Sequence, residues 1–132
     1  MVLGDYISQW KEVFSWVPQG SVLGPILFVI FINDIADAIT SHKKLFADDT
    51  NIFSIINSNL DSIQLQNDIN SVVEWCRLWL MRLNEAKCKV MHIGNQNKQY
   101  PYTIDTNGGN QLIIVKTTRK KDLGVVITND LR

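Results

Sequence analysis

The first half of the fold is decided by Lys44-Leu45-Phe46-Ala47-Asp48-Asp49-Thr50-Asn51-Ile52-Phe53. Its two flanks, 44–46 and 51–56, are short runs rich in aromatic and branched residues, which favour β-strands. The residues between them include an Asp pair, and Asp is favoured in turns because its side chain can bond nearby backbone amides. The stretch therefore predicts a β-hairpin with Asp48 and Asp49 at its tip.

A helix is predicted on each side of this hairpin. Ser21 and Pro25 indicate the start of the first, which runs to about Asp37, because Ser can cap free amides and Pro is tolerated in a first turn. This helix is apolar almost all round, so we expect it to be buried on most sides. The second, Leu60–Leu83, has apolar residues at spacings of three and four and a plausible cap at Asp61. Its polar residues fall mostly on the opposite side: Gln64, Asp68, Glu74 and Arg77.

The last third of the chain predicts strands. Cys88–Ile93 alternates well enough for one, and Tyr102–Asp105 and Gln111–Lys116 flank the turn Asn107-Gly108-Gly109-Asn110. Such a turn is a strong hairpin signal because Gly accepts the positive φ that it requires. Leu123–Thr128 is expected as a final strand after a basic loop. The order predicts an α+β fold over residues 1–132, with helices packed on one face of an antiparallel sheet.

Composition bounds what the chain can do alone. Its 132 residues include 13 basic and 13 acidic side chains, and 45% are hydrophobic. These values indicate one globular domain with a modest core. A protein that grips nucleic acid by itself usually has a positive excess, which this chain lacks. Its basic residues do gather near the C-terminus, where a solvated face and a phosphate contact both remain possible interpretations: Lys116, Arg119, Lys120 and Lys121.

The cysteines and the apolar segments indicate the compartment. Cys76 and Cys88 are too few for a disulfide framework, so we expect buried thiols in a reducing environment. A zinc site with His92 fits no familiar ligand spacing and has no fourth ligand. The longest apolar run, Val22–Ile32, falls short of the roughly twenty residues that cross a bilayer. No secretion signal is visible, and we expect the nucleus or the cytoplasm.

Three segments in a fixed order carry a family resemblance. They are Val17–Pro25, with its Pro-Gln-Gly, Phe31-Ile32-Asn33-Asp34-Ile35 and Leu45–Thr50. Together they resemble the reverse transcriptases of non-LTR retrotransposons, especially the jockey-like group. The likeness extends from about Ser8 to the C-terminus through further matching segments: Leu65–Asn70, Trp75, Trp79, Leu83-Asn84, Lys87–Val90 and Lys121–Val125.

The resemblance implies part of a polymerase palm domain and an RNA-directed DNA polymerase activity. In that reaction a primer 3′-hydroxyl attacks the α-phosphate of a deoxynucleoside triphosphate on an RNA template. Two Mg²⁺ (or Mn²⁺) ions about 4 Å apart assist it, and hard cations select carboxylate ligands. Asp48 would be the main metal ligand and Asp49 a supporting one. The alternative to a metal-binding role is that the two Asp residues are ordinary turn residues.

Other positions match the family's binding segments. Pro18, Gln19 and Gly20 resemble the loop beside the incoming nucleotide and the templating base, where Gly allows close backbone approach. Lys87 matches a lysine near the leaving pyrophosphate, although it could be a plain surface residue. The segment Leu123-Gly124 resembles the one that supports the DNA primer end. From it we infer phosphate contact by Lys120 or Lys121.

The chain also departs from the family pattern. Trp16 stands where the family usually has Gly. The family's other catalytic aspartate lies well upstream of the Pro-Gln-Gly loop, where this sequence has only Asp5 and Glu12, in a different context. We therefore expect that the fingers and the first aspartate motif are absent and that the chain alone does not extend a primer. The alternatives are a non-catalytic nucleic-acid-binding or interaction remnant of a retroelement, and an unrelated metal-binding scaffold.

Overall fold

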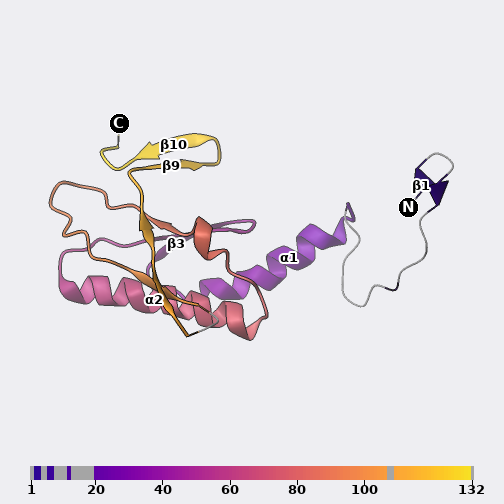
Figure 1. The fold of residues 1–132 in the computed structure, drawn as a ribbon, viewed down its shortest axis with the longest axis horizontal. Coiled ribbons are helices and arrows are strands. Elements are labelled where there is room, and N and C mark those ends of the chain that lie inside the picture. The colour runs from indigo at the N-terminus through magenta and orange to yellow at the C-terminus, as the bar shows by residue number, and fades with distance from the viewer. Residues whose placement is uncertain (1, 4–5, 8–11, 13–19, 107–108, 132) are drawn as a thin grey trace.

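The computed structural model describes residues 2–3, 6–7, 12, 20–106 and 109–131. Figure 1 shows a long helix, α2, lying along one side of a group of short strand pairs, with α1 leading away from its end. The helical elements are α1 (Leu23–Asn33), η1 (Asp34–Ala36), α2 (Asn59–Leu78) and η2 (Glu85–Lys87). In the described part of the chain, no helix has both the length and the apolar character to cross a membrane.

The strands form separate pairs. Antiparallel pairs join β1 (Val2–Leu3) to β2 (Tyr6–Ile7), β3 (His42–Phe46) to β4 (Asp49–Phe53), β6 (Thr103–Asp105) to β7 (Gln111–Ile113), and β9 (Arg119–Asp122) to β10 (Val125–Thr128). A parallel pair joins β5 (Lys89–Val90) to β8 (Val115–Lys116).

The α+β class is confirmed, but the expectation of one antiparallel sheet is wrong for the described residues. The strands are too short to build it, because the chain changes direction after a few residues. Ile114, for example, turns into the core, where it is 8% exposed, and so separates β7 from β8. The expected strand Cys88–Ile93 is reduced to β5, and the expected basic loop before Leu123 is instead strand β9.

Local sequence fixes both ends of α2. Ser58, rather than Asp61, is the N-cap, and the two side chains form a capping box in which each accepts from the other's backbone N–H. At the other end Leu80 has φ +55°, and Met81 N donates to Cys76 O at 2.8 Å. This is a Schellman ending, with Leu where Gly is usual. The helix therefore stops before the expected Leu83.

Helix α1 begins near the expected start: Ser21 Oγ accepts the Gly24 N–H at 3.2 Å, although the N-cap residue is Val22 rather than Ser21. The α-helix ends at Asn33, and η1 continues the helical path to Ala36, close to the expected Asp37. The burial of α1 was predicted wrongly. Phe28 and the C-terminal part of the helix pack on the rest of the described chain. Five other apolar side chains between residues 23 and 30 are exposed by 49% to 65%: Leu23, Ile26, Leu27, Val29 and Ile30. The described residues therefore cover the C-terminal end of this apolar helix and leave most of its N-terminal part exposed.

The core has two clusters on α2. In the first, α1 and η1 meet α2 through Ile32, Ile35, Trp75 and Cys76. The Trp75 ring lies at a tilt against Phe31, with ring centroids 5.5 Å apart, so it packs as a core residue. The second cluster joins α2 to the strands: Val73, Tyr102, Ile104 and Ile114. Leu83, just beyond the helix, packs against both clusters and so links them.

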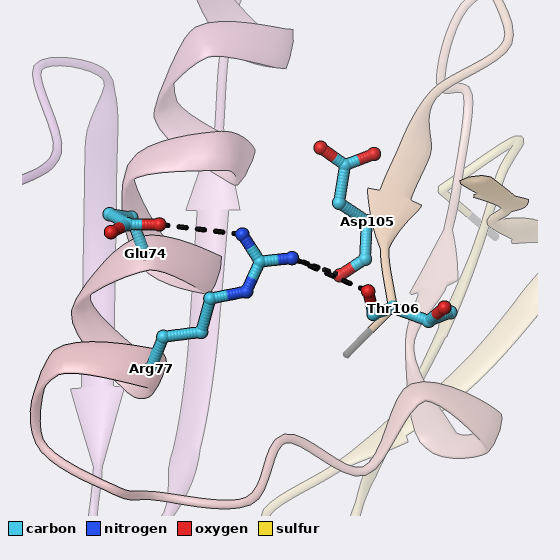
Figure 2. A network of polar contacts seen from close by, with 4 residues as sticks. All are labelled: Glu74, Arg77, Asp105 and Thr106. Carbon is cyan, nitrogen blue, oxygen red and sulfur yellow. Dashed lines mark hydrogen bonds and ion pairs between the residues drawn. The ribbon is translucent and has the colours of Figure 1, made fainter. Parts of the chain in front are cut away.

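Polar side chains of α2 bind the strands as well. The Gln66 amide pairs with the backbone of Thr103, donating to its O and accepting from its N, both at 2.9 Å. Figure 2 shows the Arg77 guanidinium reaching across from α2 to the carbonyls of Asp105 and Thr106, at 3.2 and 3.4 Å, while also contacting Glu74. These contacts hold the end of β6 on the helix.

The cysteines lie among apolar neighbours. Cys76 is buried and Cys88 is half-buried, and burial raises the pKa of both thiols. His92 stacks on Tyr102 with ring centroids 6.2 Å apart. Within the described ranges, no three His, Cys, Asp or Glu side chains are grouped so that they could hold a metal ion.

Candidate functional site

The predicted hairpin is present and tighter than expected. Strands β3 and β4 pair from His42↔Phe53 to Phe46↔Asp49, so the turn itself consists of Ala47 and Asp48 alone. Asp49 is already the first residue of β4. Both carboxylates are exposed to solvent. The hairpin therefore presents two adjacent acids at its tip, held by a paired ladder on each side.

The turn contains a strained residue. Ala47 has φ +50°, whereas Asp48 does not have a positive φ. A positive φ at the first turn residue alone is the pattern of a type II′ hairpin turn, where Gly is preferred. For Ala this conformation costs roughly 1–2 kcal/mol. Strained residues of this kind cluster at functional sites, which agrees with a functional role for the tip.

The tip has the chemistry of a weak divalent-cation site. Mg²⁺ commonly keeps several waters and is held by one or two carboxylates together with substrate phosphates, rather than by a full protein cage. Asp48 and Asp49 supply such a pair. Because both are exposed, an ion could bind there without removing either carboxylate from water. The residues present thus fit the cation that the sequence implied.

A second hairpin lies against the first. Lys120 Nζ donates to Asn51 Oδ1, and Asn51 Nδ2 donates to Asp122 Oδ2 at 3.4 Å. Asn51 is two residues beyond Asp49 in β4, so their side chains leave the same face of the strand. The fold therefore brings β9, which carries the predicted phosphate-binding lysines, into side-chain contact with β4, the strand that begins at Asp49. In Figure 1 the β9–β10 hairpin is drawn above β3, on the side away from α2.

The two lysines of β9 differ in direction. Side chains alternate along a strand, so Lys120 and Asp122 face β4 while Lys121 faces the other way with Arg119. Lys121 is exposed, and no hydrogen bond of its side chain is found among the described residues. Lys121 is therefore the better placed of the two for a partner outside the chain.

The predicted primer-support segment forms the turn of this second hairpin. Asp122 pairs with Val125, so Leu123 and Gly124 are the two turn residues, with φ +48° and +86°. Positive φ at both positions defines a type I′ turn, which favours Asn or Gly. Leu123 is strained there and half exposed, at 52%. Both hairpin tips thus carry a non-glycine residue in the left-handed region.

The remaining predicted site residues are not joined to the Asp48-Asp49 hairpin by any hydrogen bond among the described residues. Gly20 has φ +84°, which explains its need for Gly, whereas Pro18, Gln19 and Trp16 lie outside the described residues. Lys87 ends η2 with an exposed side chain. No described hydrogen bond joins it to the Asp48 hairpin, so its predicted role stays a prediction.

Asp68 is the residue that the sequence pattern misplaced. It was expected on the polar side of α2, but it is 2% exposed. Its carboxylate accepts the Thr40 N–H at 3.0 Å, the Thr40 hydroxyl at 2.9 Å and the Ser41 N–H at 2.9 Å. Burial alone would raise the pKa of Asp68, but the hydrogen bonds from Ser41 and Thr40 outweigh it and hold the pKa below the usual value. The donors come from Thr40 and Ser41, 28 and 27 residues earlier in the chain, so no local pattern around Asp68 indicates this contact.

Comparison with known proteins gives one consistent family. Residues 3–127 match the model of the family described as reverse transcriptase (RNA-dependent DNA polymerase). The chain is 30% identical over 112 residues to the RNA-directed DNA polymerase from mobile element jockey of Drosophila melanogaster, covering 78% of this chain and 12% of that protein. It is 29% identical to the Drosophila funebris jockey polymerase, covering 94% and 14%.

A third relative is the probable RNA-directed DNA polymerase from transposon BS of Drosophila melanogaster, 31% identical over 80 residues. That match covers 54% of this chain and 9% of the relative. The chain thus spans about one seventh of these relatives or less. No solved structure matches it significantly.

Proposed function

Because the chain belongs to the reverse transcriptase (RNA-dependent DNA polymerase) family, we propose that it is the palm segment that carries the polymerase's Asp48-Asp49 hairpin. In the intact enzyme this segment would help add deoxynucleotides to a DNA primer on an RNA template. The observation that carries the proposal is the pair of exposed acids on a tight hairpin, with the basic strand β9 in contact with its second strand. Its relatives are named as RNA-directed DNA polymerases.

The residues have distinct proposed roles. Asp48 and Asp49 would hold Mg²⁺ or Mn²⁺, which when bound would neutralise phosphate charge in the transfer of a nucleotidyl group. Lys121, with Leu123 and Gly124, would contact and support the primer strand near this site. Most of the reaction is positioning and charge stabilisation, so the rigid ladder beneath the acids is the main contribution of this segment.

Metal binding at the hairpin tip is the first expected result. Asp48→Asn should lower Mn²⁺ affinity by about tenfold or more, since losing even an outer-shell partner commonly costs 10- to 100-fold. Water-proton relaxation of the 132-residue chain titrated with Mn²⁺ measures this affinity. Asp37→Asn removes the same charge from an exposed position away from the tip and should leave it unchanged. Equal affinities for the Asp48→Asn variant and the unaltered chain would refute the metal role.

Primer extension is expected to be absent from a polypeptide of this sequence. The match to the family begins at residue 3, and the acids before Pro18 are only Asp5 and Glu12. Phosphoryl transfer depends on several placed charges at once, so one carboxylate pair should not suffice. The assay is elongation of a labelled DNA primer on an RNA template with Mg²⁺ or Mn²⁺. Extension that Asp48→Asn abolishes would overturn this expectation.

Nucleic-acid contact by β9 predicts a change in salt dependence. Lys120→Ala together with Lys121→Ala should weaken binding to a primer–template duplex and flatten the plot of log affinity against log salt concentration, by roughly one unit of slope per lost phosphate contact. Lys121→Ala alone should produce most of the change, because Lys120 is engaged by Asn51. Lys98→Ala, an exposed lysine outside β9, is the control. An unchanged slope in the double variant would exclude phosphate contact by this strand.

The Mn²⁺ titration and the salt-dependence assay together distinguish the polymerase segment from a second candidate function, a non-catalytic remnant. A salt-dependent duplex affinity without any metal site at the tip would favour a non-catalytic nucleic-acid-binding remnant. The exposed first turns of α1 support the polymerase segment instead, because an apolar helix surface of this kind normally packs against further protein. We propose that other parts of the longer polymerase cover it.

A further inference from the structure

We propose that Asp68 is a positioning residue that aims the Asp48-Asp49 hairpin by fixing the chain where β3 begins. The inference rests on the proposed metal role of the tip only for its functional consequence. Its structural basis is a set of three hydrogen bonds, from Thr40 N–H, Thr40 hydroxyl and Ser41 N–H, to one buried carboxylate on α2. Ser41 directly precedes the first residue of β3.

The contact lies at the base of the β3–β4 hairpin, at the opposite end from Asp48 and Asp49. From Ser41 to Asp48 the chain runs up β3 for a length of about 20 Å at roughly 3.3 Å per residue. A change of direction of about 5° at the base would thus move the tip by about 2 Å. A functional constellation needs its groups held within about 0.5 Å. Small changes at Thr40 and Ser41 therefore matter more at Asp48 than at the anchor itself.

Two other contacts act on the same segment. Lys43 Nζ donates to the carbonyls of Ala36 and Ile39, the latter at 2.7 Å, and so holds β3 to the chain that precedes it. Leu45 packs against the first core cluster. Both limit how far β3 can lift. Asp68 differs from them because it ties the backbone of Thr40 and Ser41 to the long helix α2, the element on which both core clusters are built.

The same helix offers a matched control. Asp61 also accepts two backbone N–H groups and one hydroxyl from consecutive residues, Asn57 and Ser58. Those donors belong to the N-terminal cap of α2 rather than to the approach to β3. Asp61→Asn should therefore disturb a carboxylate with the same kind of partners, on the same helix, without touching the hairpin base.

The test compares three variants of the full 132-residue chain: Asp68→Asn, Thr40→Val and Asp61→Asn. Two quantities are measured, the ¹H–¹⁵N amide shifts of the tip residues 47–50 and the Mn²⁺ affinity of the tip. Asp68→Asn should move or broaden the tip amides and lower the affinity about tenfold. Thr40→Val removes the hydroxyl that donates to Asp68 and accepts from Gln64 Nε2, but it keeps both backbone donors to the carboxylate. It should move the same amides less and lower the affinity about threefold. Asp61→Asn should lower the unfolding midpoint. It should leave the tip amide shifts unmoved and the Mn²⁺ affinity within twofold of that of the unaltered chain.

The outcomes separate this proposal from the metal role. Unmoved tip amides in folded Asp68→Asn, or equal movement in Asp61→Asn, would overturn the positioning role. If Asp68→Asn does not fold, Thr40→Val decides the question by the same criterion. If the unaltered chain binds Mn²⁺ no better than its Asp48→Asn variant, the metal role fails. The amide shifts still show whether Asp68 aims the hairpin.

Discussion

Replacing Asp68 by Ala is expected to lower the free energy of unfolding by about 3 kcal/mol at neutral pH, since each hydrogen bond to a charged group contributes roughly 1.5–3 kcal/mol and buried donors would lose their acceptor. Urea denaturation followed by circular dichroism measures this loss. Ser58→Ala, which removes the N-cap hydroxyl of the same helix, should cost only about 1 kcal/mol. A loss for Asp68→Ala no larger than that for Ser58→Ala would show that the buried contact contributes little.

The pH dependence of this effect has a definite sign. The pKa of Asp68 is lower in the folded chain than the ordinary value of 3.8, so the folded state binds this proton less readily than the unfolded state. The stabilisation is therefore complete above the ordinary pKa and is lost as the pH falls through the folded value. The difference in stability between the unaltered chain and Asp68→Ala should be constant from pH 7 to about pH 5 and shrink below that. A difference that grows on acidification would contradict this assignment.

Replacing Trp75 by Ala is expected to cost about 3–5 kcal/mol, the usual range for removing a buried aromatic side chain. Trp75 is 7% exposed and contacts both Phe31 and Trp79, so it joins α1 to α2. Its loss should therefore also release α1. Urea denaturation by circular dichroism gives the cost, and faster amide exchange in α1 gives the release.

Trp75→Phe is the informative partner of this variant. The Trp75 Nε1–H is buried and has no hydrogen-bond partner among the described residues. Phe removes that donor while keeping an aromatic ring, so the smaller volume is offset by the loss of an unpaired polar group, which itself costs about 1–3 kcal/mol. We expect Trp75→Phe to cost about 1 kcal/mol. A cost equal to that of Trp75→Ala would indicate that the indole is held by a bond rather than by packing.

Strand and helix signals were sufficient for the local elements. The β3–β4 hairpin and the body of α2 follow from patterns within a few residues, because turn propensity and side-chain periodicity are local properties. The turn at Leu123-Gly124 did not, since Leu123 was expected to begin a strand, whereas β10 begins at Val125. The ends were less certain. Helix α2 stops at Leu78 through a Schellman ending built on Leu80, and a leucine gives no local sign of the left-handed conformation that a glycine would.

Contacts between distant segments could not be predicted in the same way. Asp68, Gln66 and Arg77 look alike as polar residues of an amphipathic helix, yet each binds the backbone of a segment 27 to 37 residues away. The exposure of α1 is a second case. Apolar composition states what a helix can bury, but only the packed structure shows which of its turns are covered.

The sequence by itself determined the family, the hairpin with Asp48 and Asp49 at its tip and the secondary structure around it, because these depend on ordered short motifs and local periodicity. The tertiary structure decided that β9 lies against β4 and that α2 anchors the base of the hairpin. Those relations depend on which polar groups find partners when the chain packs. A buried carboxylate such as Asp68 is stable only where donors from another segment meet it.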